Sequence, residues 1–301
     1  MHTDLFARPG RFYKGNLHTH STNSDGVLEA GEVSRRYRER GYDFICLSDH
    51  FLPVYGFPVT DTRPHRTAEF TTILGAEVHV PSTSLGEKWH LLANGLPADF
   101  EPTRPGESAQ ALAARCAAAG AFVSIVHPEW YSLGLDDAHG IDAAHAMEVY
   151  NHTSTVLSDR GQGWGLLDQL LARGRRLHAL ACDDAHFKVD DAFGGWVMVH
   201  AEAREPEALV AALKAGHYYS STGPEIHAIR IEDDEVEVEC SPAVGVFLLG
   251  KGSRNTQVLG HDLQRVRLQA SKLGKDSYRR IAVVDAQGRK AWSNPFWPEG
   301  S

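Results

Sequence analysis

The chain has 301 residues, of which 42% are hydrophobic and 23% charged, and its formal net charge is −9. This composition is typical of a globular protein with one large and one small domain. The interspersed charges argue against a general nucleic-acid-binding surface. No apolar run reaches membrane-spanning length, and residues 1–15 lack the apolar core of a signal peptide, so a cytoplasmic location is expected. The four cysteines form no CxxC pair, whereas histidines are unusually frequent, at 17.

Short apolar runs alternate with helix-like segments through residues 15–224. The expected strands lie at 43–47, 71–76, 89–93, 121–126, 146–150, 177–182 and 196–200. The expected helices lie at 28–40, 107–119, 163–173 and 206–215. Strands that alternate with helices predict a parallel sheet, and this number of them favours a barrel. The C-terminal strand ends of such a barrel meet on one face, so polar residues that follow the strands should converge there.

From residue 225 the pattern changes to alternation with a period of two residues. Ile229 and Ile231 precede an Asp233-Asp234 turn, and residues 236–240 alternate again after it. A second hairpin turn is expected at 285–288. We therefore expect two units, a barrel over residues 1–224 and a small antiparallel β domain over residues 225–301.

Residue types that ligate metals follow most of the expected strands. His18 and His20 lie two apart in an extended stretch, so their imidazoles point to one side, and Asp184 and His186 share a face in the same way. The strand-end candidates are His18, His20, Asp25, Asp49, His50, Glu77, His79, His90, His127, Asp184 and His186. Imidazoles and carboxylates are the ligands of many hydrolytic metal sites. Stability alone does not require histidines at so many strand ends, so these residues predict a metal site.

In combination, four motifs resemble the PHP (polymerase and histidinol phosphatase) family of metallohydrolases. These motifs are His18-Thr19-His20 with Ser24-Asp25-Gly26, Ser48-Asp49-His50, Val126-His127-Pro128 and Asp184-Ala185-His186. The resemblance covers residues 15–224 and implies an α/β fold, a distorted (β/α)7 barrel of the PHP type. Residues 216–224, together with the C-terminal β domain, resemble the carbaryl-hydrolase-like branch.

The same resemblance implies two to three divalent metal ions, with Mn, Zn and Fe as candidates. The ligands of the first ion would be His18, His20, Glu77 and Asp184. The second ion would bind His90 and His127 and share Glu77 as a bridge. The third ion would bind Asp25, His50 and His186. Many relatives have a histidine where Asp25 stands, and this difference adds negative charge to the third site.

The activity implied by the resemblance is that of a metal-dependent phosphoesterase. It would hydrolyse a small phosphomonoester or phosphodiester, with nucleotides among the candidates, by a hydroxide activated at a di- or trinuclear site. Its catalytic residues would be Glu77, His50, Asp184 and His186. A carboxylic ester or carbamate hydrolase is the alternative enzyme, and a non-catalytic metal- or ligand-binding module is the second alternative. The sequence leaves the oligomeric state open, with a homo-oligomer as one option.

Cationic side chains near the strand ends are candidates for binding a phosphate group. Arg160 and Lys188 are the best placed, and Arg63, His65 and Arg66 in the long loop 51–70 come next, although a solvated surface charge is the commoner role for each. His79 shares a strand face with Glu77, so it is either a substrate contact or a buried structural histidine.

Other polar and aromatic residues beside the strand ends are expected to support the site. Asp49 adjoins His50 and should orient a neighbour, and Asp183 should face away from the site because it precedes Asp184 in an extended segment. Glu148 and Asn151 end a strand beside the site and have either a supporting or a structural role. Trp130 either walls the pocket or packs in the core.

Overall fold

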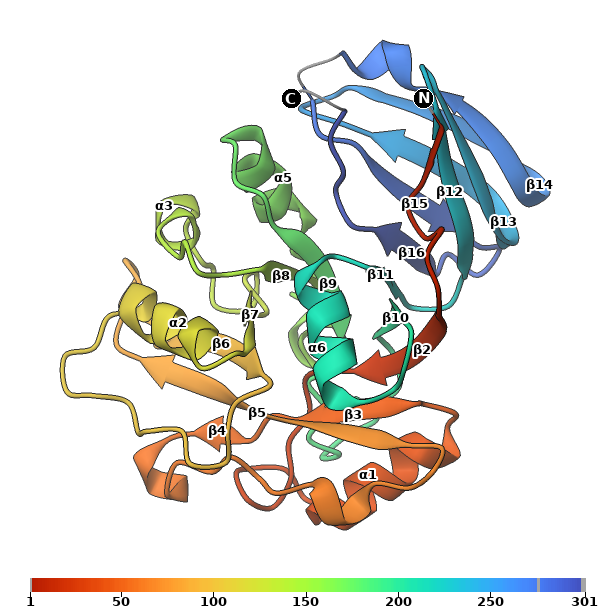
Figure 1. Cartoon of the computed structure of the whole chain (residues 1–301). Coiled ribbons are helices and arrows are strands. Elements are labelled where there is room, and N and C mark those ends of the chain that lie inside the picture. Colours follow the sequence, from red (N-terminus) through yellow and green to blue (C-terminus); the bar gives the residue numbers. More distant parts are fainter. Residues whose placement is uncertain (1, 275–276, 299–301) are drawn as a thin grey trace.

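The computed structural model describes residues 2–274 and 277–298 (Figure 1). The chain has a mixed α/β fold with one large sheet and few helices. The strands are β1 (His2–Asp4), β2 (Arg11–Asn16), β3 (Phe44–Leu47), β4 (His50–Phe51), β5 (Thr71–Val80), β6 (Trp89–Asn94), β7 (Phe122–Ile125), β8 (Ala146–Asn151), β9 (His178–Cys182), β10 (Trp196–Ala201), β11 (Tyr218–Ser221), β12 (Ile226–Glu232), β13 (Glu235–Leu249), β14 (Asn255–Gln269), β15 (Arg280–Val284) and β16 (Lys290–Ser293). The α-helices are α1 (Ala30–Glu39), α2 (Ala109–Ala118), α3 (Leu135–His139), α4 (His152–Ser158), α5 (Trp164–Ala172) and α6 (Pro206–Lys214).

Local sequence explains where the helices begin and end. In α1, Val33 and Tyr37 lie four residues apart and are buried, whereas Glu32 and Arg35 pair on the outer face at 2.7 Å. Gly41 follows with a φ of +76°, a conformation that a residue without Cβ adopts freely, and the helix stops there. The helix expected at 28–40 is thus confirmed as Ala30–Glu39.

The strands form one sheet in the order β1-β12-β13-β15-β16-β11-β10-β2-β3-β5-β6-β7-β8-β9, with β14 beside β13 and β4 beside β5. The expected alternation of parallel strands and helices is found only in part. Strands β2, β3 and β5 are parallel, as are β7, β8 and β9. Between these sets, β5 and β6 are antiparallel because loop 81–88 joins them without a helix.

The segments that follow β2 and β9 are hydrogen-bonded to each other. The Asp184 amide donates to the His18 carbonyl at 2.9 Å, and the His20 amide donates to the Ala185 carbonyl at 2.9 Å. These bonds make a parallel bridge between Thr19 and Ala185. The sheet therefore curves so that segments 17–20 and 183–186 lie side by side.

The C-terminal strands pair antiparallel, as expected from their period of two. Their turns fall at Asp233–Asp234 and at residues 285–289, where Gly288 has a φ of +78°. Ile229, Val238 and Ile281 belong to their own hydrophobic cluster. The first strand of the chain, β1, pairs with β12, and β16 pairs with β11, so the C-terminal strands continue the same sheet.

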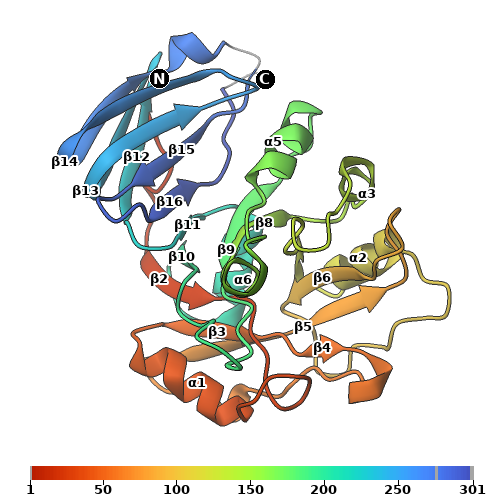
Figure 2. The ribbon, with the colours of Figure 1, turned by 180° about the vertical axis from the view of Figure 1, so that it is seen from behind.

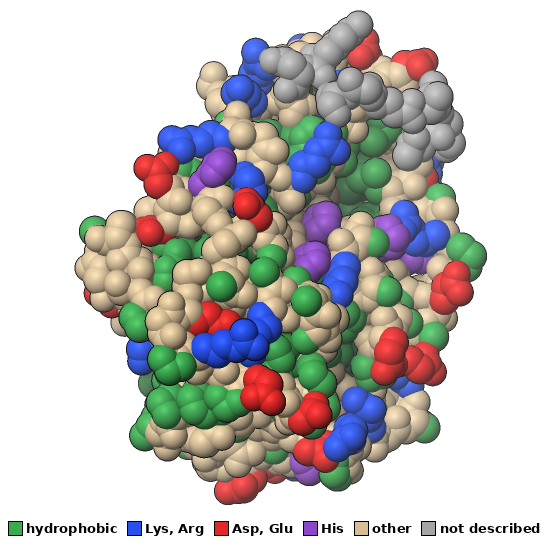
Figure 3. Space-filling view, turned by 60° about the vertical axis from the view of Figure 1, so that its left-hand side comes forward, with side chains coloured by type: hydrophobic (Ala, Val, Ile, Leu, Met, Phe, Trp, Pro, Cys, Tyr) green, Lys and Arg blue, Asp and Glu red, His purple; other side chains and the backbone are tan. Residues whose placement is uncertain are grey.

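Surface charges are interspersed on the face that Figure 3 shows, where Lys and Arg side chains lie among Asp and Glu side chains. Among the described residues, no helix is both long enough and apolar enough to cross a membrane.

An ion pair between a buried arginine and a partly exposed aspartate joins α5 to the C-terminal strands, which lie alongside this helix in both ribbon views (Figure 1 and Figure 2). The Arg280 guanidinium donates to both carboxylate oxygens of Asp168, at 3.0 and 2.7 Å. The Tyr278 hydroxyl donates to the same carboxylate at 2.8 Å, and the guanidinium stacks 3.8 Å from the centre of the Trp164 ring. Only 8% of the Arg280 side chain is exposed, so this charge depends on Asp168.

We expect Asp168→Ala to lower the free energy of unfolding by about 2 kcal/mol, because it leaves a buried guanidinium without its bidentate partner while the partly exposed Asp168 limits the loss. Urea denaturation of the metal-free protein measures this change. Glu39→Ala, which removes an exposed ion pair with Arg35 on α1, is the control and should cost about 0.5 kcal/mol or less. Equal losses of stability in the two variants would show that the Arg280–Asp168 ion pair contributes no more than an exposed ion pair does.

Candidate metal centre

Two histidines that follow β2 lie at the centre of the molecule. His18 and His20 are fully buried, and their ring centres lie 5.3 Å apart. The His18 Nδ1–H group donates to Glu148 Oε1 at 2.7 Å, so its Nε2 atom faces the other way. His20 Nε2 lies 3.0 Å from Asp184 Oδ1. The structure therefore brings together the pair after β2 and a carboxylate after β9.

Glu77 is the second element of the centre. It lies inside β5 and not beyond its end, because β5 continues to Val80 as the first strand of the antiparallel hairpin with β6. Glu77 Oε1 lies 2.7 Å from His90 Nδ1 and 3.1 Å from His127 Nε2, and Oε2 lies 2.7 Å from His50 Nδ1. This one carboxylate thus contacts imidazoles on three sides, as a bridging ligand would.

A third group of ligand atoms surrounds Asp25. Its Oδ1 atom lies 3.2 Å from His186 Nε2, 3.4 Å from His50 Nε2 and 4.0 Å from His20 Nδ1. The Lys188 ammonium binds the other oxygen at 2.9 Å. Asp25 is therefore positioned beside His50 and His186, which the PHP resemblance grouped with it, although one of its oxygens is held by a lysine.

Four overlapping sets of these side chains have ligand atoms within 4.8 Å of one another, which is the spacing that a bound ion requires. The sets are His20, Asp25, His50 and His186; His50, Glu77, His79 and His90; His18, His127 and Asp184; and His18, His20 and Glu77. Within the described chain, His18 Nε2, Glu77 Oε2 and Asp25 Oδ1 are buried and make no hydrogen bond of normal geometry, although each lies close to another ligand-type atom. Buried polar atoms are normally paired, so these converging atoms fit the metal ions that the sequence predicts.

The backbone is strained at two of the candidate ligands. His127 has a φ of +29° and Asp184 a φ of +60°, in a region that residues with a Cβ rarely adopt. Such strain persists only where the surrounding structure imposes it, and it concentrates at functional sites. No short sequence pattern predicts this conformation.

Neighbouring charges at the centre shift the pKa values of its carboxyl and imidazole groups. Burial favours the protonated form of Glu77, but the neighbouring His50 and His90 outweigh it and hold the pKa of this carboxyl well below its usual value. Burial likewise disfavours the charged form of His186, but the neighbouring carboxylates of Asp25, 3.2 Å away, and Asp184 outweigh it and raise its pKa to about 9. The centre therefore holds its carboxylates as anions, as metal ligation requires.

Glu148 and Asn151 support the candidate ligands from behind. Glu148 Oε1 accepts from His18, and Oε2 accepts from the His127 amide at 2.7 Å and from Asn151 Nδ2 at 2.9 Å. Asn151 Nδ2 also lies 3.1 Å from Asp184 Oδ2. Of the two roles that the sequence left open, this geometry favours the supporting one.

Asp49 and Asp183 hold the surrounding loops and do not face the ligand atoms. Asp49 accepts from the Ser21 amide at 2.7 Å, and from the hydroxyls of Ser24 at 2.7 Å and Thr60 at 2.6 Å. Asp183 accepts from the Tyr37 hydroxyl at 2.6 Å and from the amides of residues 193–195 at 2.8 Å each. Both interpretations from the sequence agree with these bonds.

The residues expected to contact substrate are not all brought together. Lys188 lines a cavity of about 260 Å³ above the ligand atoms. His79 is 3% exposed and lies within the cluster: its Nδ1–H donates to the Trp89 carbonyl at 3.1 Å, so its Nε2 accepts from His50 Nδ1 at 3.0 Å. Arg160 is exposed, follows α4 and does not line this cavity. Of these three, Lys188 alone has the position expected of a substrate contact.

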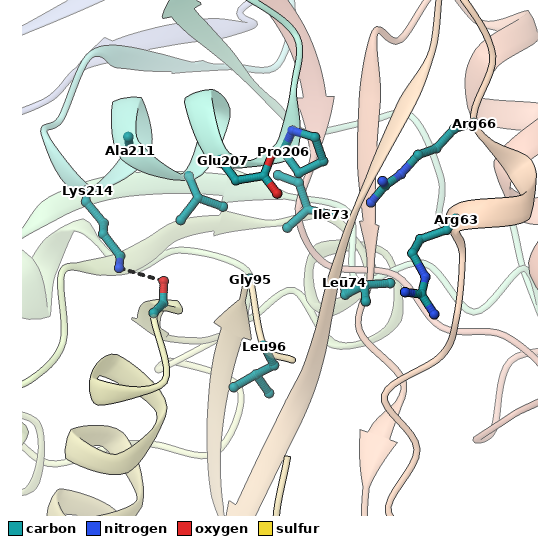
Figure 4. A pocket seen from close by; sticks show the side chains of 12 residues that line it. Arg63, Arg66, Ile73, Leu74, Gly95, Leu96, Pro206, Glu207, Ala211 and Lys214 are labelled. Atoms are coloured by element: carbon teal, nitrogen blue, oxygen red, sulfur yellow. Dashed lines mark hydrogen bonds between the residues drawn. The ribbon is translucent and has the colours of Figure 1, made fainter. Parts of the chain in front are cut away.

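Arg63 and Arg66 lie elsewhere, in a separate cavity of about 510 Å³ between the long loop, β5 and α6. Figure 4 shows both arginines on one side of this cavity and Glu207 and Lys214 of α6 on the other. Arg63 is paired with Asp61, and Lys214 donates to a backbone carbonyl at 2.6 Å. These two arginines are therefore not substrate contacts of the metal centre.

Helix α4 provides a part of the cavity wall that was not predicted from the sequence. Thr153, Ser154 and Leu157 line the cavity, and Asp191 lines it while accepting the His186 and Phe187 amides at 3.0 Å. Asn151 could have predicted the start of α4, because its side chain accepts a hydrogen bond from the amide three residues later and caps the helix.

A solved two-domain protein from Bacteroides vulgatus, described as containing a predicted PHP-like metal-dependent phosphoesterase, has a similar structure. It is 16% identical, the alignment covers 92% of this chain and 91% of that one, and the TM-score is 0.55. The chain has a PHP-like fold. No protein-family model and no curated protein matches this chain.

Two further solved structures align with this chain over 57% of its length and 87% of their own. One is an amidohydrolase from Chromobacterium violaceum with bound sulfate and no metal, at 16% identity and a TM-score of 0.45. The other is a putative metal-dependent phosphoesterase from Bifidobacterium adolescentis, at 15% identity and a TM-score of 0.41. None of these descriptions bears on the carbaryl-hydrolase-like branch, which stays a prediction.

Glu148→Gln should weaken divalent-metal binding about 10- to 100-fold, because the amide NH₂ would oppose a donor where the carboxylate now accepts from His18, His127 and Asn151. Titration of the metal-free protein with Zn²⁺ or Mn²⁺ measures the affinity. Glu69→Gln, in an exposed loop, is the control. Unchanged affinity in Glu148→Gln would show that this support is dispensable.

Proposed function

We propose that the protein is a metal-dependent hydrolase, with phosphoesterase as the leading assignment. The observation that carries this proposal is the convergence of nine ligand-type side chains from separate segments, with buried ligand atoms that make no hydrogen bond of normal geometry. The candidate ligands are His18, His20, Asp25, His50, Glu77, His90, His127, Asp184 and His186. The description of the Bacteroides vulgatus structure as PHP-like and phosphoesterase-containing supports the same assignment.

Two to three ions of Mn, Zn or Fe would supply a water activated near neutral pH and would stabilise charge on the attacked group. The protein would supply the ligands and hold them in a fixed arrangement. Glu77 reaches two groups of imidazoles at once, Asp184 spans His18 and His20, and His50 and His186 surround Asp25. Lys188 at the cavity wall would orient an anionic substrate.

The proposal extends to the architecture, the location and the substrate. We propose a distorted (β/α)7 barrel over residues 1–224, a small β domain over residues 225–301, a cytoplasmic location and a small phosphorylated substrate, with a homo-oligomer as one option for the assembly.

A panel of phosphomonoesters and phosphodiesters, assayed with Mn²⁺, Zn²⁺ or Fe²⁺, should show turnover that chelation abolishes and metal restores. Aryl esters and carbamates belong in the same panel. Hydrolysis of carbamates with inert phosphoesters would replace the phosphoesterase assignment with the alternative. Absence of all turnover, with metal verified as bound, would leave only the non-catalytic binding module.

Glu77→Gln should remove about two equivalents of bound metal together, because a bridging carboxylate serves two ions at once. Asp25→Asn is the matched control and should remove about one equivalent, since Asp25 belongs to one of the ligand sets whereas Glu77 belongs to two. Elemental analysis of the purified variants gives the stoichiometry. A Glu77→Gln protein that keeps its full metal content would contradict the bridging role.

A further inference from the structure

Exposed apolar side chains gather around the cavity above the candidate metal centre. Eight large hydrophobic residues are exposed in the described part of the chain. Five of them line this cavity or lie within two residues of one that does, namely Val27, Trp130, Val156, Leu157 and Val189. Of these five, Trp130 and Leu157 line the cavity itself, and exposed apolar side chains in a pocket are typical of a ligand-binding site.

Trp130 is held in place while much of its ring remains accessible. Its indole packs edge-on against His127 at 5.2 Å and against His90 at 5.6 Å between ring centres, and 45% of the residue is exposed. A rigid aromatic side chain offers a large apolar area at low entropic cost. Trp130 thus presents a preformed apolar wall directly beside two candidate ligands.

Leu157 faces Trp130's cavity from α4 and is 61% exposed. The helix cannot shift freely, because Asn151 accepts from the Ser154 amide at 2.8 Å and also lies 3.1 Å from Asp184. Ser154 and Leu157 are three residues apart, so they lie on one side of the helix and both line the cavity. The position of Leu157 is therefore tied to the centre.

The same cavity offers little to a polyanionic substrate. Lys188 is the one Lys or Arg among the described residues that line it, and its ammonium is paired with Asp25 at 2.9 Å. A site for several phosphate groups carries several forked or ammonium donors. The volume of about 260 Å³ lies just below the usual range for ligand pockets, which indicates a small substrate.

We propose that Trp130 and Leu157 form an apolar subsite that binds an aryl or branched alkyl group attached to the scissile ester. The substrate class is then a small ester with one charged reacting group and an apolar substituent, and not a nucleoside di- or triphosphate or a sugar bisphosphate. This inference rests on the proposed function, since it assigns a substrate to the same centre.

The test compares two non-hydrolysable probes that share one headgroup, methylphosphonate and phenylphosphonate, by calorimetric titration of the metal-loaded protein. The phenyl compound should bind about tenfold more tightly, because the apolar subsite accepts its ring. Leu157→Ser and Trp130→Ala should each reduce this ratio to about threefold or less. Leu259→Ser is the matched control, an equally exposed leucine on β14 at 66%, and should keep the ratio.

Equal affinity for the two phosphonates, binding of neither, or an unchanged ratio in both subsite variants would overturn the inference. Thermal melts establish that the variants are folded. Because Leu157 is the more exposed of the two residues, Leu157→Ser is the variant less expected to disturb folding. Self-association that Leu157→Ser abolishes, with an unchanged phosphonate ratio, would assign the apolar surface to a contact between copies instead. Failure of the proposed function has a different signature, the absence of ester turnover, which leaves the binding ratio measurable.

Discussion

A carboxylate charge buried at the centre of the molecule is the constraint on which the site depends. Glu77 is fully buried, and nitrogen atoms of six histidines lie within 3.9 Å of its oxygens. An uncompensated charge in such a place is costly. The chain therefore has to bring imidazoles from several distant segments to this residue, and the curvature of the sheet that joins segments 17–20 and 183–186 does so.

Two further buried carboxylates hold the loops around the candidate metal centre in place. Asp49 and Asp183 are each adjacent in sequence to a candidate ligand, His50 or Asp184, and each accepts several hydrogen bonds from loops around the centre. Because these acids are satisfied, they stabilise loops without competing for the ions. Glu148 has the same effect on His18 and on the strained backbone at His127.

The cavity combines two environments at short range. Its base consists of ionisable ligand groups, whereas Trp130 and Leu157 give its mouth an apolar surface. The hairpin of β5 and β6 contributes to the base, since antiparallel pairing places His79 opposite His90 beside Glu77. Helix α4 contributes the apolar side of the mouth. A reacting polar group and an apolar substituent can thus be bound in adjacent places.

The sequence by itself determined which residue types and which local turns the protein uses. The two-residue spacing of His18 and His20 placed both imidazoles on one side, helix ends and hairpin turns followed from glycine and aspartate positions, and family motifs predicted the ligand sets. These signals are local, so they can be interpreted without knowing the fold. Only the tertiary structure decided that β5 and β6 pair antiparallel, that β1 joins β12, and that α4 brings Leu157 to the cavity. It also showed that Arg63 and Arg66 line a separate cavity, away from the candidate metal centre. These outcomes depend on hydrogen bonds and packing between residues far apart in the chain, which no local pattern encodes.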